Sequence, residues 1–194
     1  MFAKFTGPFK EFGLFAGIVY VLDRILSRLP GQMRLYFYEL MVQPIPSEPL
    51  VPAKFVKHME FRLIEEGDPE VALMPAREDI KAARFEQDVI CFGAYKKGEL
   101  IGYIWFAFNH YDEDEVRARF EIHPADASVF DFDLYLFEAY RMGFSFVGMW
   151  DGASRYLRER GVRYTFSRLT RFNTASRRAH DHLGWKRIGR ALFL

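Results

Sequence analysis

A tight turn ahead of a helix is the first place where this sequence could do chemistry. Gly143 and Ser145 are small residues between an expected strand at 129–137 and an expected helix that begins near Ser145. Backbone N–H groups at a helix start attract phosphate oxygens, and small residues let a phosphate approach the backbone. The turn therefore predicts a phosphate-binding loop, although the same residues also suit an ordinary strand-to-helix connection.

A second candidate segment, residues 173–185, lies near the end of the chain and reads NTASRRAHDHLGW. Asn173 and Ser176 are expected to cap a helix there, because Asn is among the residue types that best satisfy the free N–H groups of a first turn. His180 and His182 are two positions apart and face different sides of that helix, so they do not form a metal-binding pair. Without further clustered His, Cys or acidic residues, a metal enzyme is not expected.

The segment at 173–185 resembles the closing helix of the GNAT superfamily of N-acetyltransferases. In that family an Asn opens the helix, a small residue follows, a Tyr lies seven residues after the Asn, and Leu-Gly-aromatic ends it. Here the spacing holds, but His180 occupies the Tyr position. The resemblance implies that His180 is the acid that protonates the departing thiolate of coenzyme A. The alternative is a polar residue on the exposed side of a helix.

The segment from Asp133 to Phe146 resembles the cofactor motif of the same family, in which a strand with open backbone pairs with the pantetheine arm and a loop of the form Gln/Arg-x-x-Gly-x-Gly/Ala holds the pyrophosphate. This copy departs from the pattern: either Tyr140 takes the leading place, or Arg141 leads and aromatic residues replace the glycines. The first register is preferred, because backbone approach needs small residues. The resemblance spans residues 59–194 and implies acetyl-CoA or another acyl-CoA as co-substrate, bound by Leu134, Leu136, Arg141, Met142, Gly143, Phe144, Ser145, Asn173 and Ser176.

Acidic side chains on the expected strands supply the candidates for a base. In the strand at 129–137, regular alternation places Asp131 and Asp133 on one face. The resemblance implies that one of them deprotonates the ammonium group of an amine acceptor, directly or through water, with Glu121 as the reserve choice. All three also suit exposed strand acids or ion-pair partners. Cys91 lies in a hairpin strand away from the motif, so no covalent intermediate is expected.

The elements that must position these residues follow from hydrophobic periodicity. Strands are expected at 33–42, 59–64, 89–95, 100–108, 116–122, 129–137 and 162–169, and helices at 13–29, 77–85, 145–160 and 173–185. This order predicts a domain of the α+β type, with a mixed, mostly antiparallel sheet flanked by helices. Four prolines in residues 44–52 predict a linker, which separates an N-terminal part at 1–52 from an acyltransferase domain at 53–194.

The helix at 13–29 carries an apolar stripe. Its uncharged stretch at 12–22 is far shorter than the roughly 20 residues needed to cross a bilayer, and no cleavage site follows it, so neither a membrane span nor a removed signal is expected. Two alternatives are open. The helix packs on the body of the protein or on a second copy in a homodimer, which is favoured. Otherwise residues 12–29 make a peripheral membrane contact, with basic side chains near the phosphates: Lys4, Lys10, Arg24 and Arg28.

Composition and charge narrow the function classes. Half of the 194 residues are apolar, so one main domain with a core is expected, and a single cysteine excludes an intrachain disulfide and favours a reducing cytoplasm. Residues 154–194 carry 11 Lys and Arg against two acids, and residues 1–43 carry five against three; since the net charge is +1, residues 44–153 carry −10. A basic part beside an acidic part suits a protein that binds an anion and a cation. No nucleic-acid-binding motif accompanies the basic part.

These observations predict an acyltransferase that moves an acetyl or longer acyl group from acyl-CoA to a primary amine, by direct attack in a ternary complex. The alternative is a non-catalytic module of the same fold, peripheral to a membrane or oligomeric, whose altered loop has lost the coenzyme. Fold alone does not select the acceptor.

Overall fold

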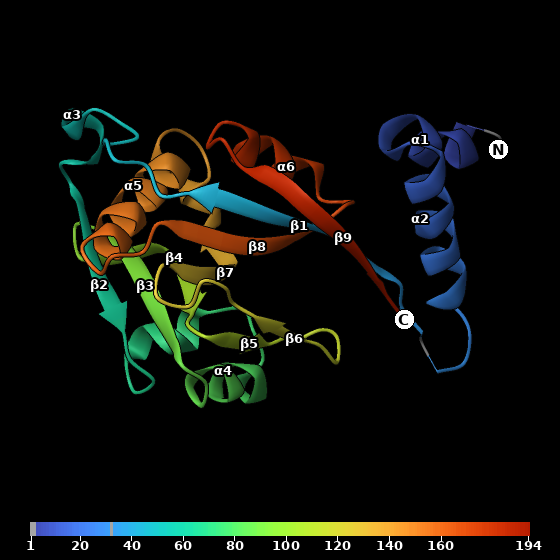
Figure 1. Ribbon diagram of the computed structural model, residues 1–194, viewed down its shortest axis with the longest axis horizontal. Helices are drawn as coiled ribbons and strands as arrows, with labels where there is room; N and C mark the ends of the chain where they lie inside the picture. Colours follow the sequence, from blue (N-terminus) through green and yellow to red (C-terminus); the bar gives the residue numbers. More distant parts are fainter. Residues whose placement is uncertain (1–2, 32) are drawn as a thin grey trace. The chain divides into compact units, whose positions relative to one another are not determined.

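The computed structural model describes residues 3–31 and 33–194 (Figure 1). Seven strands form one mixed sheet, in the order β2 (Met59–Ile64), β3 (Val89–Lys96), β4 (Glu99–Ala107), β7 (Ser128–Leu136), β8 (Tyr164–Thr170), β1 (Tyr36–Pro44) and β9 (Lys186–Phe193). A separate two-stranded sheet consists of β5 (His110–Asp112) and β6 (Arg119–Glu121). The expected fold class, a mixed and mostly antiparallel sheet flanked by helices, is confirmed.

The chain divides into two compact units, which are described separately. One comprises residues 44–166, and the other comprises the residues up to Gln43 together with residues 167–194. The division falls within β8, so the first residues of this strand belong to one unit and its last residues to the other. This division differs from the predicted boundary at residue 52, because β1 groups with the end of the chain and pairs antiparallel with β9.

The unit of residues 44–166 is built on four antiparallel strands. The expected hairpin is confirmed: β3 pairs with β4 from Val89↔Ala107 to Lys96↔Glu99. Lys97 and Gly98 close it with φ values of 54° and 79°, the left-handed conformation that two-residue hairpin turns require. β2 pairs with the other edge of β3, and β4 pairs with β7.

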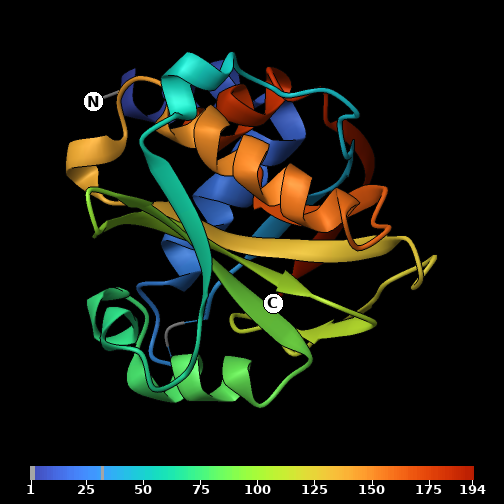
Figure 2. The same cartoon turned by 90° about the vertical axis from the view of Figure 1, so that its left-hand side faces the viewer.

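Helices cover both faces of this part of the sheet (Figure 2). α5 (Ser145–Arg158) lies on one face, where a Cβ on its Gly152 would come within 2.5 Å of the ring of Phe61. α4 (Glu78–Phe85) lies on the other face, where Phe85 meets Trp105 edge-on with centroids 4.8 Å apart. Small residues on α5 therefore permit close approach to the sheet, and α5 is the crossover that makes β7 and β8 parallel. Short helical turns, α3 (Ala53–Val56), η1 (Pro69–Leu73) and η2 (Glu138–Tyr140), complete the unit.

The proline-rich segment after β1 is held along its length. The N–H of Ile45 donates to the carbonyl of Arg163 at 2.8 Å, and the N–H of Leu50 donates to Oδ1 of Asp151 on α5 at 2.7 Å. Proline removes donors, but the residues between the prolines still anchor this stretch to α5 and to the start of β8.

The second unit contains α1 (Ala3–Phe12), α2 (Leu14–Leu26), β1, the end of β8, α6 (Thr174–Asp181) and β9. Gly13, with φ of 82°, separates α1 from α2, where the sequence predicted one helix at 13–29 and none before it. One side of α2 is buried, where Ala16 and Val19, together with Phe12 at the end of α1, pack with Phe37 of β1. Of the other apolar residues that recur at three- and four-residue steps, Phe15, Leu22 and Leu29 are exposed and Leu26 is half-buried. No helix in the described residues is long and apolar enough to span a bilayer.

Candidate functional site

A bulge interrupts β7 at the point where the sequence predicted regular alternation. Tyr103 of β4 pairs with Tyr135, and Trp105 pairs with Phe132, so Asp133 and Leu134 together face one residue of β4. Asp133 has φ of 45°, which is uncommon for a residue other than glycine. The extra residue breaks the period of two, so the expectation that Asp131 and Asp133 share one face is wrong. Bulges of this kind concentrate beside functional sites, where they redirect side chains.

The same strand parts from its parallel neighbour. β7 and β8 pair only from Ser128↔Tyr164 to Phe130↔Phe166. Among the described residues, β7 continues to Leu136 and from Asp131 onward pairs with β4 but not with β8. The other edge of this part of β7 therefore has backbone N–H and C=O groups that β8 does not bind. An extended ligand can pair with such an edge in the way that a strand does.

The loop after β7 leads directly to the start of a helix. Arg141 Nε donates to the carbonyl of Leu136 at 3.0 Å, which ties the loop back to the strand. Gly143 has φ of 83°, and α5 then begins without a side-chain cap from Phe144. The first N–H groups of α5 therefore lack the usual side-chain acceptor and, with the helix dipole, favour an anion.

Two large apolar side chains flank this loop. Met142 is 87% exposed, and Phe144 is half exposed and stacks on Phe55, with ring centroids 4.1 Å apart. The elements agree with those expected from the sequence: Leu134 and Leu136 lie on β7, residues 141–144 lie in the loop, and Ser145 begins α5.

Asp133 is held by an arginine that the sequence did not single out. Arg84 of α4 is buried; its Nη1 lies 2.5 Å from Oδ2 of Asp133, and its Nη2 lies 2.6 Å from Oδ2 of Asp114. Burial opposes the charged guanidinium, but the two carboxylates raise the pKa of Arg84 above its ordinary value. The guanidinium also lies over the rings of Trp105 and Phe132, at 5.4 and 5.3 Å. An arginine in the last turn of an amphipathic helix gives no signal of this role in sequence.

The other predicted acid–base residues occupy different environments. Asp131 lies opposite Phe106 and is buried, whereas about a third of the Asp133 side chain is exposed. Glu121 is exposed on β6, opposite His110. Burial, and then the Asp133 charge, raise the pKa of the Cys91 thiol above its ordinary value, so it stays protonated at neutral pH.

The remaining predicted residues belong to the other unit. Asn173 caps α6, since its Oδ1 accepts from the N–H of Ser176 at 3.0 Å, as predicted. His180 is 5% exposed, and burial lowers its pKa to about 4. Its ring is therefore neutral at pH 7. Its burial excludes the alternative that His180 is a polar residue on the exposed side of the helix.

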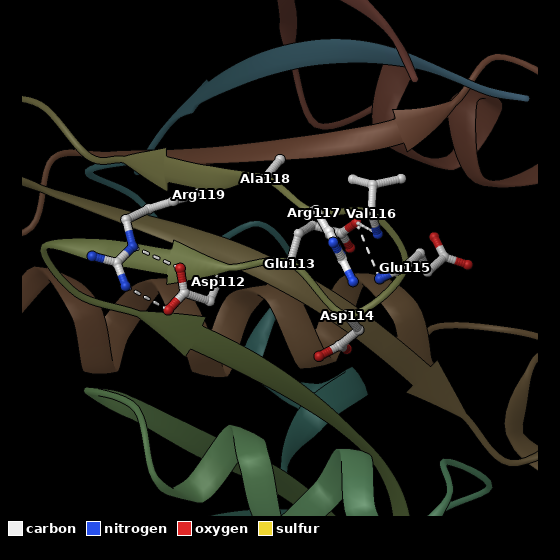
Figure 3. A pocket seen from close by; sticks show the side chains of 8 residues that line it. All are labelled: Asp112, Glu113, Asp114, Glu115, Val116, Arg117, Ala118 and Arg119. Atoms are coloured by element: carbon white, nitrogen blue, oxygen red, sulfur yellow. Dashed lines mark hydrogen bonds and ion pairs between the residues drawn. The ribbon is translucent and has the colours of Figure 1, made fainter. Parts of the chain in front are cut away.

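An acidic hairpin loop lies near the sheet in the unit of residues 44–166. Residues 112–119 line a hollow of about 470 Å³ (Figure 3). Arg119 binds Asp112, and the side chain of Glu113 accepts from the N–H groups of Glu115 and Val116, as Figure 3 shows. Arg84 of α4 binds Asp114. These contacts neutralise or engage most of the loop's charge. In the described residues, no group of three or more His, Cys, Asp or Glu side chains is arranged to hold a metal.

Comparisons with known proteins agree with this geometry at the level of fold. No protein-family model matches the sequence, and no curated protein matches it significantly. A functionally unknown conserved protein from Staphylococcus epidermidis matches with a TM-score of 0.56 and 12% identity, over 89% of this chain and 65% of its own. A protein described as a GNAT-family acetyltransferase, from Novosphingobium aromaticivorans, matches with a TM-score of 0.51 and 13% identity, over 82% and 63%.

The aminoglycoside N-acetyltransferase AAC(6')-Iy, in complex with a bisubstrate analogue of CoA, matches with a TM-score of 0.53 and 22% identity, over 71% of this chain and 97% of its own. The chain has the fold of the GNAT acetyltransferases. It spans less than two thirds of the length of the first two matches. The GNAT resemblance inferred from residues 133–146 and 173–185 is thereby confirmed for the fold.

The buried neutral His180 predicts a pH-dependent stability. The unfolded chain binds a proton at this residue below its ordinary pKa of about 6.5, whereas the folded protein does so only near pH 4. Stability should therefore fall as the pH drops through this window, by up to about 3 kcal/mol from this group. Urea unfolding of wild type and His180→Gln between pH 7 and pH 4 measures the effect, which the variant should lack.

His182→Gln is the matched control, since His182 is exposed and lies two residues away. Its pH profile should follow that of the wild type. Equal pH slopes for wild type and His180→Gln would contradict a buried, neutral imidazole.

Proposed function

We propose that this protein transfers an acetyl or longer acyl group from acyl-CoA to a primary amine, in a ternary complex. The observation that carries the proposal is the parting of β7 from β8 after Phe130, directly ahead of the uncapped start of α5. An open strand edge followed by free helix N–H groups suits a ligand with an amide-containing arm and a pyrophosphate, as coenzyme A has. The GNAT fold and the CoA ligand of AAC(6')-Iy support the same choice.

In this proposal the strand and the loop divide the work of binding. The backbone of Leu134 and Leu136 pairs with the pantetheine arm, and the N–H groups from Gly143 to Ser145 bind the pyrophosphate. Arg141 fixes the loop to β7 through its bond to the Leu136 carbonyl. Met142 and Phe144 are exposed beside the loop and suit contact with apolar parts of the coenzyme. Asn173 and Ser176 are retained as coenzyme contacts by resemblance alone.

Gly143→Ala should weaken acetyl-CoA binding about tenfold or more. The φ of 83° at Gly143 is costly for alanine, by roughly 1–2 kcal/mol, and relaxing it turns the loop N–H groups away from the phosphates. No atom lies within 4 Å of the added Cβ, so the effect is conformational. Isothermal titration with acetyl-CoA, and with a long-chain acyl-CoA, measures it.

Gly161→Ala is the matched control at the other end of α5. Gly161 has φ of 81° and equally open surroundings, so the variant carries the same backbone strain away from the loop. Its acyl-CoA affinity should match the wild type. Absence of acyl-CoA binding in the wild type, at micromolar to millimolar concentrations, would reject the acyltransferase proposal.

For the chemistry, we assign Asp133 as the base for the acceptor ammonium, directly or through water. Its side chain is partly exposed at the bulge, whereas Asp131 is buried and Glu121 lies on the separate β5–β6 sheet. The protonated Cys91 thiol favours direct attack of the amine over a covalent intermediate. His180 is retained by resemblance alone as the group that assists the thiolate; because its ring is neutral at pH 7, it acts in this proposal as a hydrogen-bond donor and not as an imidazolium.

Asp133→Asn should lower kcat/KM about 100-fold or more, because an amide cannot accept the proton. Turnover is followed as thiol release from acetyl-CoA, with a panel of primary amines that includes neamine and spermidine. Asp114→Asn is the control, since it removes the other carboxylate from the same Arg84 guanidinium and leaves the base in place. If both variants lose activity equally, Asp133 acts only through its ion pair.

A second candidate function, peripheral membrane attachment, rests on the exposed side of α2. This exposed face consists of large apolar residues at helical spacing, each between 44% and 74% exposed: Leu14, Phe15, Ile18, Leu22 and Ile25. Phe15 at the edge of this face also meets Phe37 of β1 edge-on, with ring centroids 5.5 Å apart, whereas the buried contact of α2 with β1 is made by Ala16 and Val19. An unpaired stripe of this size requires a partner or an apolar environment.

Charge favours an anionic lipid surface as that partner. Asp23 is the only acid in residues 13–31, and it is buried and bound by Arg34 Nε and the Leu35 N–H, both at 2.9 Å. Arg24 and Arg28 are exposed at the border of the exposed face. An apolar helix face with a basic border is typical of helices that lie in the membrane interface. A second copy would instead bring like charges together.

Sedimentation with vesicles tests this attachment. The wild type should bind phosphatidylcholine vesicles that contain half phosphatidylglycerol, more weakly at high salt. Ile18→Glu should bind about tenfold or more weakly, because burial of one Ile contributes roughly 1.5–3 kcal/mol. Leu73→Glu, an equal change at an exposed residue of η1, should bind normally. Light scattering that shows a dimer which Ile18→Glu dissociates, without vesicle binding, would assign the face to a second copy.

A further inference from the structure

A completely buried glutamate lies at the centre of the strand β1. Glu39 is 0% exposed and lies opposite Arg190 of β9, in the ladder that joins the two strands side by side (Figure 1). A buried carboxylate is costly unless cations and hydrogen bonds surround it. Neither the acyl-transfer proposal nor the membrane proposal uses this residue.

Four arginines surround Glu39, and together the five residues are called the Glu39 cluster. Arg177 Nε lies 2.8 Å from Oε2, and Arg187 Nη1 donates to Oε1 at 3.1 Å. Arg171 Nε and Arg190 Nε lie 3.6 and 3.8 Å from Oε1. They come from β9, α6 and the turn after β8, so three parts of the chain converge on one carboxylate.

The charges of the Glu39 cluster do not balance. Within the described residues, Glu39 is the only carboxylate within ion-pair distance of these four guanidiniums, so the cluster carries a net charge of +3. Burial, and then repulsion from Arg177, lower the pKa of Arg171 below its ordinary value, although Glu39 opposes this. An arginine keeps its charge even so, and the excess positive charge must be offset from outside.

Hydrogen bonding is also incomplete in the Glu39 cluster. Arg177 Nε is close to Glu39 but is not aligned as a hydrogen-bond donor, and it has no other acceptor among the described protein groups. Arg171 Nη1 is likewise buried without an acceptor, while its Nη2 donates to the carbonyl of Phe12. Each unsatisfied buried donor costs about 1–3 kcal/mol. An oxyanion bound at the exposed side of the cluster would offset the excess positive charge.

The cluster is reachable from solvent on one side. The side chains of Arg187 and Arg190 are 46% and 50% exposed, whereas those of Arg171 and Arg177 are 17% and 24% exposed. Two arginines can therefore receive an anion at the surface, and two lie deeper. A phosphate group carries between −1.5 and −2 charges at pH 7 and has three acceptor oxygens, which fits a net charge of +3 better than a carboxylate does.

We propose that Arg171, Arg177, Arg187 and Arg190 form a binding site for a phosphate monoester, with Glu39 holding the guanidiniums apart and in place. The phosphate belongs either to the 3′ position of coenzyme A or to a separate ligand, such as a phosphorylated acceptor. Guanidinium groups bind phosphate through paired, charge-assisted hydrogen bonds, which gives geometric selectivity over chloride.

Titration with inorganic phosphate tests the site, against chloride at matched ionic strength. The wild type should bind phosphate, and the double variant Arg187→Gln/Arg190→Gln should bind it at least tenfold more weakly. These two residues are half exposed, so the variant should fold, which circular dichroism checks. Arg178→Gln is the control, because Arg178 is exposed on the same helix, α6, and lies outside the cluster. Equal phosphate affinity in the wild type and the double variant would overturn the proposal.

Comparison of coenzyme A with dephospho-coenzyme A identifies the source of the phosphate. The site holds the 3′-phosphate if the double variant has lower affinity for coenzyme A but unchanged affinity for dephospho-coenzyme A, and if coenzyme A displaces phosphate. If phosphate still binds with coenzyme A present, the site serves a separate phosphorylated ligand. The inorganic phosphate result does not depend on acyl-CoA binding, so this proposal and the acyltransferase proposal can fail separately.

Discussion

The ion pair between Arg84 and Asp133 holds the conformation on which the candidate acyl-transfer site depends. Asp133 adopts a left-handed backbone conformation in the middle of a strand, and such a conformation persists only where its surroundings stabilise it. A buried guanidinium, shared with Asp114 and lying over two aromatic rings, provides that stabilisation. The bulge turns the end of β7 away from the regular ladder, next to the point where its pairing with β8 ends. One polar contact from α4 therefore governs the shape of the strand that is proposed to bind the coenzyme.

Local pattern was sufficient for the elements whose stability is local. The strand at 59–64, the hairpin around Lys97 and Gly98, and the helix from Ser145 to the stop at Gly161 all lie where periodicity, turn residues and helix stops placed them. The Asn173 cap could likewise be predicted from the sequence, because its acceptor and donor are three residues apart. These features depend on neighbours along the chain, and the sequence contains both partners within a few positions.

Features that depend on residues far apart in the chain could not be predicted from the sequence. The bulge at Asp133 is an extra residue relative to β4, and only the paired register reveals it. The position of β1 depends on pairing with a strand about 150 residues away, so the sequence did not show that β1 groups with the end of the chain. Residue charges were visible in sequence, but the convergence of four arginines on Glu39 was not, because they come from three separate elements. The sequence identified Asp131, Asp133 and His180 as candidates from their residue types and positions. Their burial and contacts depend on tertiary packing and could not be predicted.

The environments of these residues determine their protonation states at neutral pH. Burial of His180 and of Cys91 shifts their pKa values in opposite directions but with the same result, since each group is kept in its neutral form at pH 7. Arg84 and the arginines around Glu39 keep their charge, since guanidinium groups do so even when buried. Each unit thus contains permanently charged arginine together with a group that stays neutral: Cys91 in residues 44–166, and His180 in the other unit. In the unit of residues 44–166, a protonated Cys91 leaves the partly exposed carboxylate of Asp133 as the group suited to the proposed proton transfer. A histidine in the place of the family's tyrosine is compatible with this scheme, because a neutral imidazole, like a phenol, can donate a hydrogen bond without carrying charge.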